Sequence, residues 1–119
     1  MLDVADLIGT PFSKMPCWEL AKEYYRRQGI ELQEYYKIDC RNTDNITGYT
    51  KLKEPEKGCI CAFSLSGNGI DHVGIYLGDN QLLHSTKFSG VCIERLSKYV
   101  PRMKGAYRYD PCNNRDKSI

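Results

Sequence analysis

Cys17 is the first residue of the chain whose type and position favour nucleophilic chemistry. The segment from Pro16 to Gln28, PCWELAKEYYRRQ, predicts a helix, because proline suits the first turn, good helix formers follow and Gly29 stands where helices often end. A thiol at a helix N-terminus meets the positive end of the backbone dipole. We therefore expect a lowered thiol pKa at Cys17, although the commoner role of a free cysteine is that of a small buried hydrophobe.

A base for this thiol must come from the only two histidines, His72 and His84, which flank a predicted hairpin with Gly78-Asp79-Asn80 at its turn. A three-residue turn places His84 opposite Gly74. The two imidazoles are then diagonal neighbours on one sheet face, with Cα atoms about 7–8 Å apart. A two-residue turn would put them on opposite faces. We expect both imidazoles on the face that meets the helix bearing Cys17.

A thiol and two imidazoles fit the arrangement of an activated nucleophile, in which one imidazole takes the thiol proton and the other orients the first. Simple packing of two hairpin histidines is the alternative. Zinc is a rival use of Cys59, Cys61, His72 and His84. The Cys-Ile-Cys spacing lacks the two-residue gap of a zinc knuckle and alternates within a strand pattern, so we expect neither a metal nor a cofactor.

The elements that must position these residues indicate an α+β domain, with the helix packed against one face of a small antiparallel sheet. Residues 31–57 show no sustained period, and the segment KLKEPEKG, residues 51–58, resembles a solvated connector. Beyond Gly58 short strand-like runs form a predicted meander, at 59–65, 72–77, 81–86, 91–96 and 105–110. We expect one domain over residues 1–110 and a polar C-terminal tail over residues 111–119.

Composition excludes several classes of protein. With 119 residues, 41% hydrophobic and 27% charged, the chain has the composition of one ordinary globular domain. A net charge of +2 is too small to favour nucleic acid as a partner, and the absence of a long apolar run argues against membrane insertion. The N-terminus lacks a signal-peptide pattern, so we expect synthesis in the cytoplasm and reduced cysteines.

Two segments resemble the NlpC/P60 cysteine peptidases. The first, IGTPFSKMPCWELAKEYYRRQGIEL, is similar to the family's Gly-x-Pro-aromatic stretch, nucleophile and following helix, in a Cys-Trp version similar to phage tail-assembly members. The second, KGCICAFSLSGNGIDHVGIYLGDNQLLHSTKFSGVCIERL, is similar to the family's His-Val-Gly-Ile-Tyr strand and its downstream His. The resemblance covers about residues 8–109.

The resemblance implies a papain-like core and a role for each matching residue. It implies Cys17 as nucleophile, His72 as general base and acid, and His84 as the polar third member. Substrate or oxyanion contacts fall to the Cys17 backbone N–H, Phe12 and Trp18. The chain departs from the family pattern at three positions, where Pro16, Glu19 and Cys59 replace Asp, Gly and Asp. A carboxylate at Glu19 is expected to oppose the thiolate.

We therefore expect a cysteine hydrolase, an endopeptidase or amidase, that cleaves amide bonds in peptidoglycan stem peptides through a Cys-His-His triad. The alternatives are a phage tail structural or binding module without required turnover, another thiol-dependent acyl transferase, and a delivered toxin. The expected partners are a peptidoglycan peptide and, in the phage setting, tail proteins. A cell-wall substrate then implies release by lysis, a virion tail or another delivery apparatus.

Overall fold

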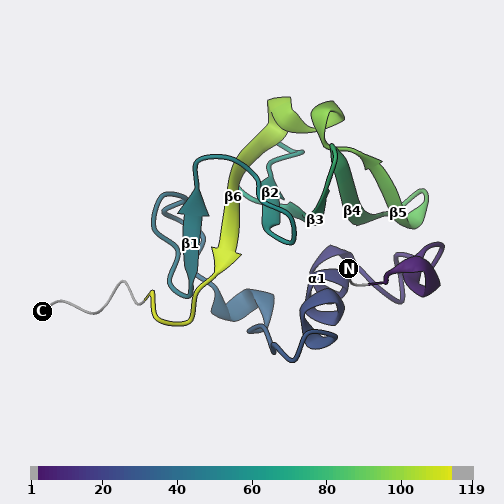
Figure 1. Cartoon of the computed structure of the whole chain (residues 1–119). Coiled ribbons are helices and arrows are strands. Elements are labelled where there is room, and N and C mark those ends of the chain that lie inside the picture. Colours follow the sequence, from purple (N-terminus) through teal and green to yellow (C-terminus); the bar gives the residue numbers. More distant parts are fainter. Residues whose placement is uncertain (1–2, 114–119) are drawn as a thin grey trace, which may run out of the picture.

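The computed structural model describes residues 3–113 and consists of one α-helix and one six-stranded sheet (Figure 1). The helix is α1 (Cys17–Arg26), preceded and followed by short 3-10 turns η1 (Ala5–Leu7) and η2 (Tyr35–Lys37). The strands are β1 (Tyr49–Leu52), β2 (Ile60–Phe63), β3 (His72–Gly78), β4 (Gln81–Thr86), β5 (Gly90–Arg95) and β6 (Met103–Tyr109). Two further 3-10 turns, η3 (Leu96–Lys98) and η4 (Val100–Arg102), connect β5 with β6. The predicted α+β class is confirmed.

The strand order of the sheet is β1-β6-β2-β3-β4-β5, and every neighbouring pair is antiparallel. Strands β2 to β5 form the expected meander. Strand β6 departs from it, because the chain crosses back after β5 and places β6 between β1 and β2. Strand β1 begins where the sequence shows no sustained period and ends inside the predicted connector at residues 51–58; Tyr49 at its start is buried and pairs with Tyr109. The predicted tail beyond residue 113 lies outside the described residues.

Helix α1 covers one face of the sheet, as its apolar spacing predicts. Leu20, Ala21 and Tyr24 are buried and belong to the core cluster that includes Val73, Ile75, Leu83 and Val91 of the sheet. The other face carries a second cluster, with Cys61, Phe63 and Leu82 packed under Leu96, Tyr99 and Met103. In Figure 1 α1 lies at the lower edge of the view and the segment between β5 and β6 at the upper edge. Both faces of the central strands are therefore buried.

The β3–β4 hairpin has the predicted register for a different reason. Its turn is the two-residue Asp79-Asn80, both with positive φ, and Gly78 pairs with Gln81. A bulge between Tyr76 and Gly78 then shifts the pairing by one residue, so that His84 lies opposite Gly74. The bulge offsets the short turn and keeps His72 and His84 on one face.

The described part of the chain holds no helix long and apolar enough to cross a membrane.

Candidate active site

The structure brings the two histidines into direct contact. Nε2 of His72 lies 2.9 Å from Nδ1 of His84, and both side chains are buried. Gly74 makes this contact possible: a Cβ there would lie 3.1 Å from Cβ of His84 and 2.7 Å from Cδ1 of Leu82. Phe63 packs beside the His72 ring, with centroids 5.8 Å apart. The pair is thus held in a fixed orientation by the second core cluster.

A carboxylate that the sequence analysis missed completes this row of polar groups. Oε1 of Glu94 lies 2.8 Å from Nε2 of His84 and accepts a hydrogen bond from the Tyr99 hydroxyl at 2.8 Å. Lys98 donates to the other carboxylate oxygen at 2.6 Å. The register of β4 with β5 contains the signal, since it sets His84 opposite Cys92 and so makes Glu94 its diagonal neighbour.

The expectation that both imidazoles face the helix bearing Cys17 was wrong. Side chains alternate along a strand, and Val73 and Leu83, next to the histidines in sequence, take the helix-facing positions. His72 and His84 therefore lie on the opposite face. Cys17 contacts this strand at the start of β3. There the backbone N–H of Val73, which belongs to the His72–Val73 peptide, interacts with the Cys17 sulfur. The His72–Val73 peptide at the start of β3 is therefore the part of this strand that the thiol contacts.

The Cys17 thiol does not have the lowered pKa that its position predicts. Burial raises the pKa of Cys17, and this effect exceeds the opposing one of the backbone N–H groups of Val73, Trp18 and Cys17 itself. Of the nearby carboxylates, Asp71 raises this pKa further, whereas Glu19 is exposed and forms an ion pair with Lys22 at 3.3 Å. The resting thiol is therefore protonated, and the expected opposition from Glu19 comes from Asp71 instead.

Both imidazoles are neutral at pH 7. Burial, together with the neighbouring His84, lowers the pKa of His72 to about 4. Burial also lowers the pKa of His84, against the opposing effect of Glu94. The hydrogen bond from Lys98, with those from Tyr99 and His84, lowers the pKa of Glu94 to about 2. The site thus combines a neutral thiol, two neutral imidazoles and one carboxylate.

The predicted substrate-contact residues lie in different environments. The Trp18 side chain is buried, and its indole N–H donates to the Gln33 carbonyl at 2.9 Å, so its backbone N–H is the group that faces the site. Phe12 is half-buried and lines a surface hollow with Phe88, which is fully exposed. This hollow lies beside the turn after β4, at the sheet end where β3 begins. No side chain caps the first turn of α1, where Pro16 precedes Cys17.

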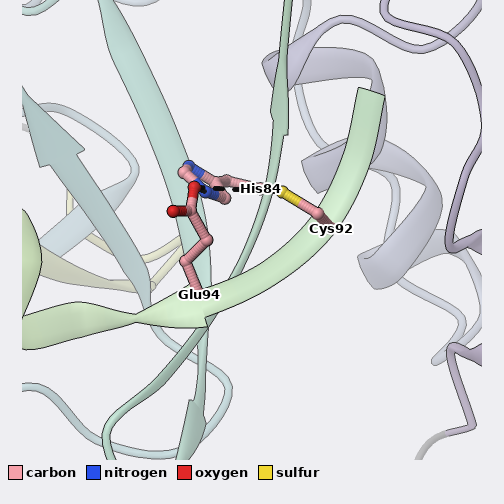
Figure 2. Close-up of side chains that lie close together, drawn as sticks. All are labelled: His84, Cys92 and Glu94. Atoms are coloured by element: carbon pink, nitrogen blue, oxygen red, sulfur yellow. Dashed lines mark hydrogen bonds and ion pairs between the residues drawn. The ribbon is translucent and has the colours of Figure 1, made fainter. Parts of the chain in front are cut away.

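The structure does not bring the four candidate zinc ligands of the sequence analysis into one cluster; these are Cys59, Cys61, His72 and His84. The Cys59 and Cys61 sulfurs contact each other at 4.0 Å in the second core cluster. Among the described residues, the group with metal-ligand chemistry consists of His84, Cys92 and Glu94, whose ligand atoms lie within 4.8 Å of one another. Figure 2 shows Cys92 and Glu94 reaching from β5 toward His84 on the neighbouring strand.

Comparison with known proteins matches the chain to one family and to solved structures of similar fold. A sequence profile of the NlpC/P60 family matches residues 7–107. The fold is similar to that of a protein from Staphylococcus aureus subsp. aureus Mu50 described as similar to a lipoprotein of the NLP/P60 family, with a TM-score of 0.59 and 23% sequence identity. The similarity covers 86% of this chain but 34% of that protein, so the chain spans about a third of its length. No curated protein sequence matches the chain.

Proposed function

The chain belongs to the NlpC/P60 family, whose members are generally cysteine peptidases acting on the cell wall, and from this premise we propose that it hydrolyses amide bonds in peptidoglycan stem peptides. Cys17 serves as nucleophile, His72 as general base and acid, and His84 as the residue that orients His72. The observation that carries the proposal is the 2.9 Å contact between His72 and His84. His72 is the first residue of β3, and its peptide with Val73 contacts the Cys17 sulfur.

The neutral resting state defines the first step. Because Nε2 of His72 is engaged with His84, Nδ1 is the ring nitrogen left for the thiol. As the sulfur of Cys17 attacks the amide carbonyl, its proton passes to Nδ1 of His72, so thiolate and imidazolium form only during the attack. Charge develops on the carbonyl oxygen, where the uncapped backbone N–H groups of Cys17 and Trp18 are available to stabilise it.

The remaining steps return the site to its starting state. His72 gives its proton to the departing amine, the C–N bond breaks, and the acyl group remains on the Cys17 sulfur as a thioester. Water then attacks the thioester while His72 accepts a proton from it. The acid product leaves, and the proton returns from His72 to the sulfur. Each step moves one proton between groups that the proposal names, and none requires a further cofactor.

Digestion of purified peptidoglycan tests the proposal. We expect wild-type protein to release stem-peptide fragments detectable by mass spectrometry, and Cys17→Ala to release none while keeping its circular dichroism spectrum, because the side chain is small and only half-buried. A matched control is Cys112→Ala, which removes an exposed thiol. Retained cleavage by Cys17→Ala would place the nucleophile elsewhere. Binding of peptidoglycan by both proteins without cleavage would identify a binding module.

A further inference from the structure

Glu94 is the terminal acceptor of the row of polar groups that begins at His72. Its carboxylate is ionised at neutral pH and has no proton to donate, because Lys98 and Tyr99 both donate to it. The His84 nitrogen that faces it, Nε2 at 2.8 Å, must therefore be the donor. This assigns the proton of His84 to Nε2 from the contacts alone.

The assignment extends to His72. A neutral imidazole carries one N–H, so His84 with its proton on Nε2 has an unprotonated Nδ1. That Nδ1 lies 2.9 Å from Nε2 of His72 and has to accept, which places the His72 proton on Nε2. Nδ1 of His72 is then left with a free lone pair.

We propose that Glu94 is a positioning residue of this active site: by fixing the proton on Nε2 of His84, its carboxylate holds Nδ1 of His72 unprotonated and ready to accept the proton of Cys17. The inference rests on the proposed function and adds a fourth residue to it. The opposite order of protons, with Nδ1–H of His84 donating to His72, would put the His72 proton on Nδ1. His72 would then present an N–H to the thiol and be unable to act as its base.

Metal binding is the alternative use of the same residues, since His84, Cys92 and Glu94 lie close together (Figure 2). Both ring nitrogens of His84 and both oxygens of Glu94 already have hydrogen-bond partners. The Cys92 sulfur is 4.0 Å from Oε1 of Glu94. A cation on Nε2 of His84 would displace the proton that Glu94 accepts. The contacts therefore favour a chain of hydrogen bonds from His72 to Glu94, to which Cys92 adds only a long thiol contact with the Glu94 carboxylate.

Nitrogen NMR of protein labelled with 15N-histidine tests the proton positions directly, and the assignment is simple because the chain has two histidines. At pH 7 we expect both wild-type rings to carry the proton on Nε2. In Glu94→Leu, which removes the acceptor, we expect a mixture of tautomers at both rings. Glu94→Gln keeps an acceptor oxygen and is expected to restore most of the wild-type pattern. Glu94 is partly exposed, so both variants are expected to fold.

Kinetics provide the second readout. We expect Glu94→Leu to lower kcat about tenfold to a hundredfold with KM little changed, and Glu94→Gln to recover part of the loss. Glu19→Gln is the matched carboxylate control, because Glu19 lies in the first turn of α1 but is paired with Lys22. Cys92→Ser separates the two uses of the cluster, since the hydrogen-bond chain predicts wild-type tautomers and kcat, whereas a metal site predicts losses like those of Glu94→Leu.

The results separate the two proposals. Unchanged tautomers and unchanged kcat in Glu94→Leu would overturn the role of Glu94, and so would zinc bound by the wild type and lost in Cys92→Ser. If wild-type protein fails to cleave any peptidoglycan, the proposed function fails, but the NMR comparison still decides whether Glu94 fixes the two imidazoles. If the wild type cleaves peptidoglycan and Glu94→Leu has the wild-type tautomers, the proposed function stands and the role of Glu94 as a positioning residue is refuted.

Discussion

Gly74 offers a sharp test of how closely the imidazole pair depends on its surroundings. It lies directly opposite His84, on the face that the histidines share. A Cβ at this position would lie 2.7 Å from Cδ1 of Leu82, 3.1 Å from Cγ of Leu82 and 3.1 Å from Cβ of His84. Leu82 and His84 are fully buried, so neither is free to move into solvent. Gly74→Ala must therefore displace the strand or the imidazole.

The magnitude follows from two opposing effects. Crowding in a close-packed core costs about 1–3 kcal/mol. Replacing a strand glycine by alanine recovers about 0.5–1 kcal/mol of backbone entropy. The midpoints of these ranges give a net loss of about 1.25 kcal/mol, which for a domain of this size lowers Tm by about 4–8 °C. The same displacement lengthens the 2.9 Å contact between His72 and His84, and we expect a drop in kcat of about tenfold or more.

The assay pairs thermal unfolding with peptidoglycan hydrolysis. Gly105→Ala is the matched control, because its Cβ would lie 2.7–2.9 Å from atoms of the Tyr107 side chain but on the other face of the sheet, opposite Ala62. We expect the control to lose stability while keeping kcat. A Gly74→Ala protein with wild-type Tm and kcat would refute the argument that the absent side chain makes room for the pair. Equal losses of kcat in both variants would refute the claim that only a side chain on the face of the two histidines disturbs the imidazole pair.

Three further predictions concern pH, thiol reactivity and metals. The pKa of His72 lies at about 4 in the folded state, below its ordinary value of 6.5, so the unfolded chain binds the extra proton between these values. The free energy of unfolding should therefore fall as the pH drops from about 6.5 to 4, by up to about 1.4 kcal/mol per pH unit. Urea unfolding at a series of pH values measures this dependence on pH, which should be weaker in His72→Gln. The groups around His72 that share in this titration are His84, Asp71 and Glu94. Because burial raises the pKa of Cys17, its alkylation by iodoacetamide, followed by peptide mass spectrometry, should be slow at pH 7 and accelerate above pH 9; fast labelling at pH 7 would contradict a protonated resting thiol. EDTA should leave hydrolysis unchanged, and a loss restored by zinc would support a metal site at His84, Cys92 and Glu94.

Pairing arithmetic along the sequence predicts that the two histidines share a sheet face, although it assumes a three-residue turn and directs that face toward α1. Register depends on short-range rules, and the residues of the β3–β4 hairpin place His84 opposite Gly74 even though the turn has two residues and a bulge compensates. The same arithmetic applied to the next hairpin reaches Glu94. That residue was missed because a charged side chain in a strand-like run is ordinarily a solvated position, and nothing local shows that Tyr99 and Lys98 fold back over it.

Other features depend on which surfaces the fold covers, and the sequence does not state this. The alternation of Val73 and Leu83 with the histidines predicts two faces, but both faces are buried, so periodicity alone does not say which one α1 covers. The pKa of Cys17 depends on the same point. A helix N-terminus lowers a thiol pKa in water, whereas here burial outweighs it. Strand β1 escapes prediction because its pairing partner β6 is distant in sequence.

The protonated thiol and the fixed tautomer of His72 form one consistent arrangement. A thiolate already present at rest would need no base, and the position of the proton on His72 would matter little. With burial holding the proton on Cys17, the proposed attack requires a lone pair on His72 at that moment, and the neutral imidazole supplies one only if its proton is on the far nitrogen. The contacts from His72 through His84 to Glu94 meet that requirement on the face away from α1, where Tyr99 packs against the His84 ring. Glu94 acts on the tautomer of His72 through His84, which its carboxylate contacts, whereas the carboxylate that raises the pKa of Cys17 is Asp71.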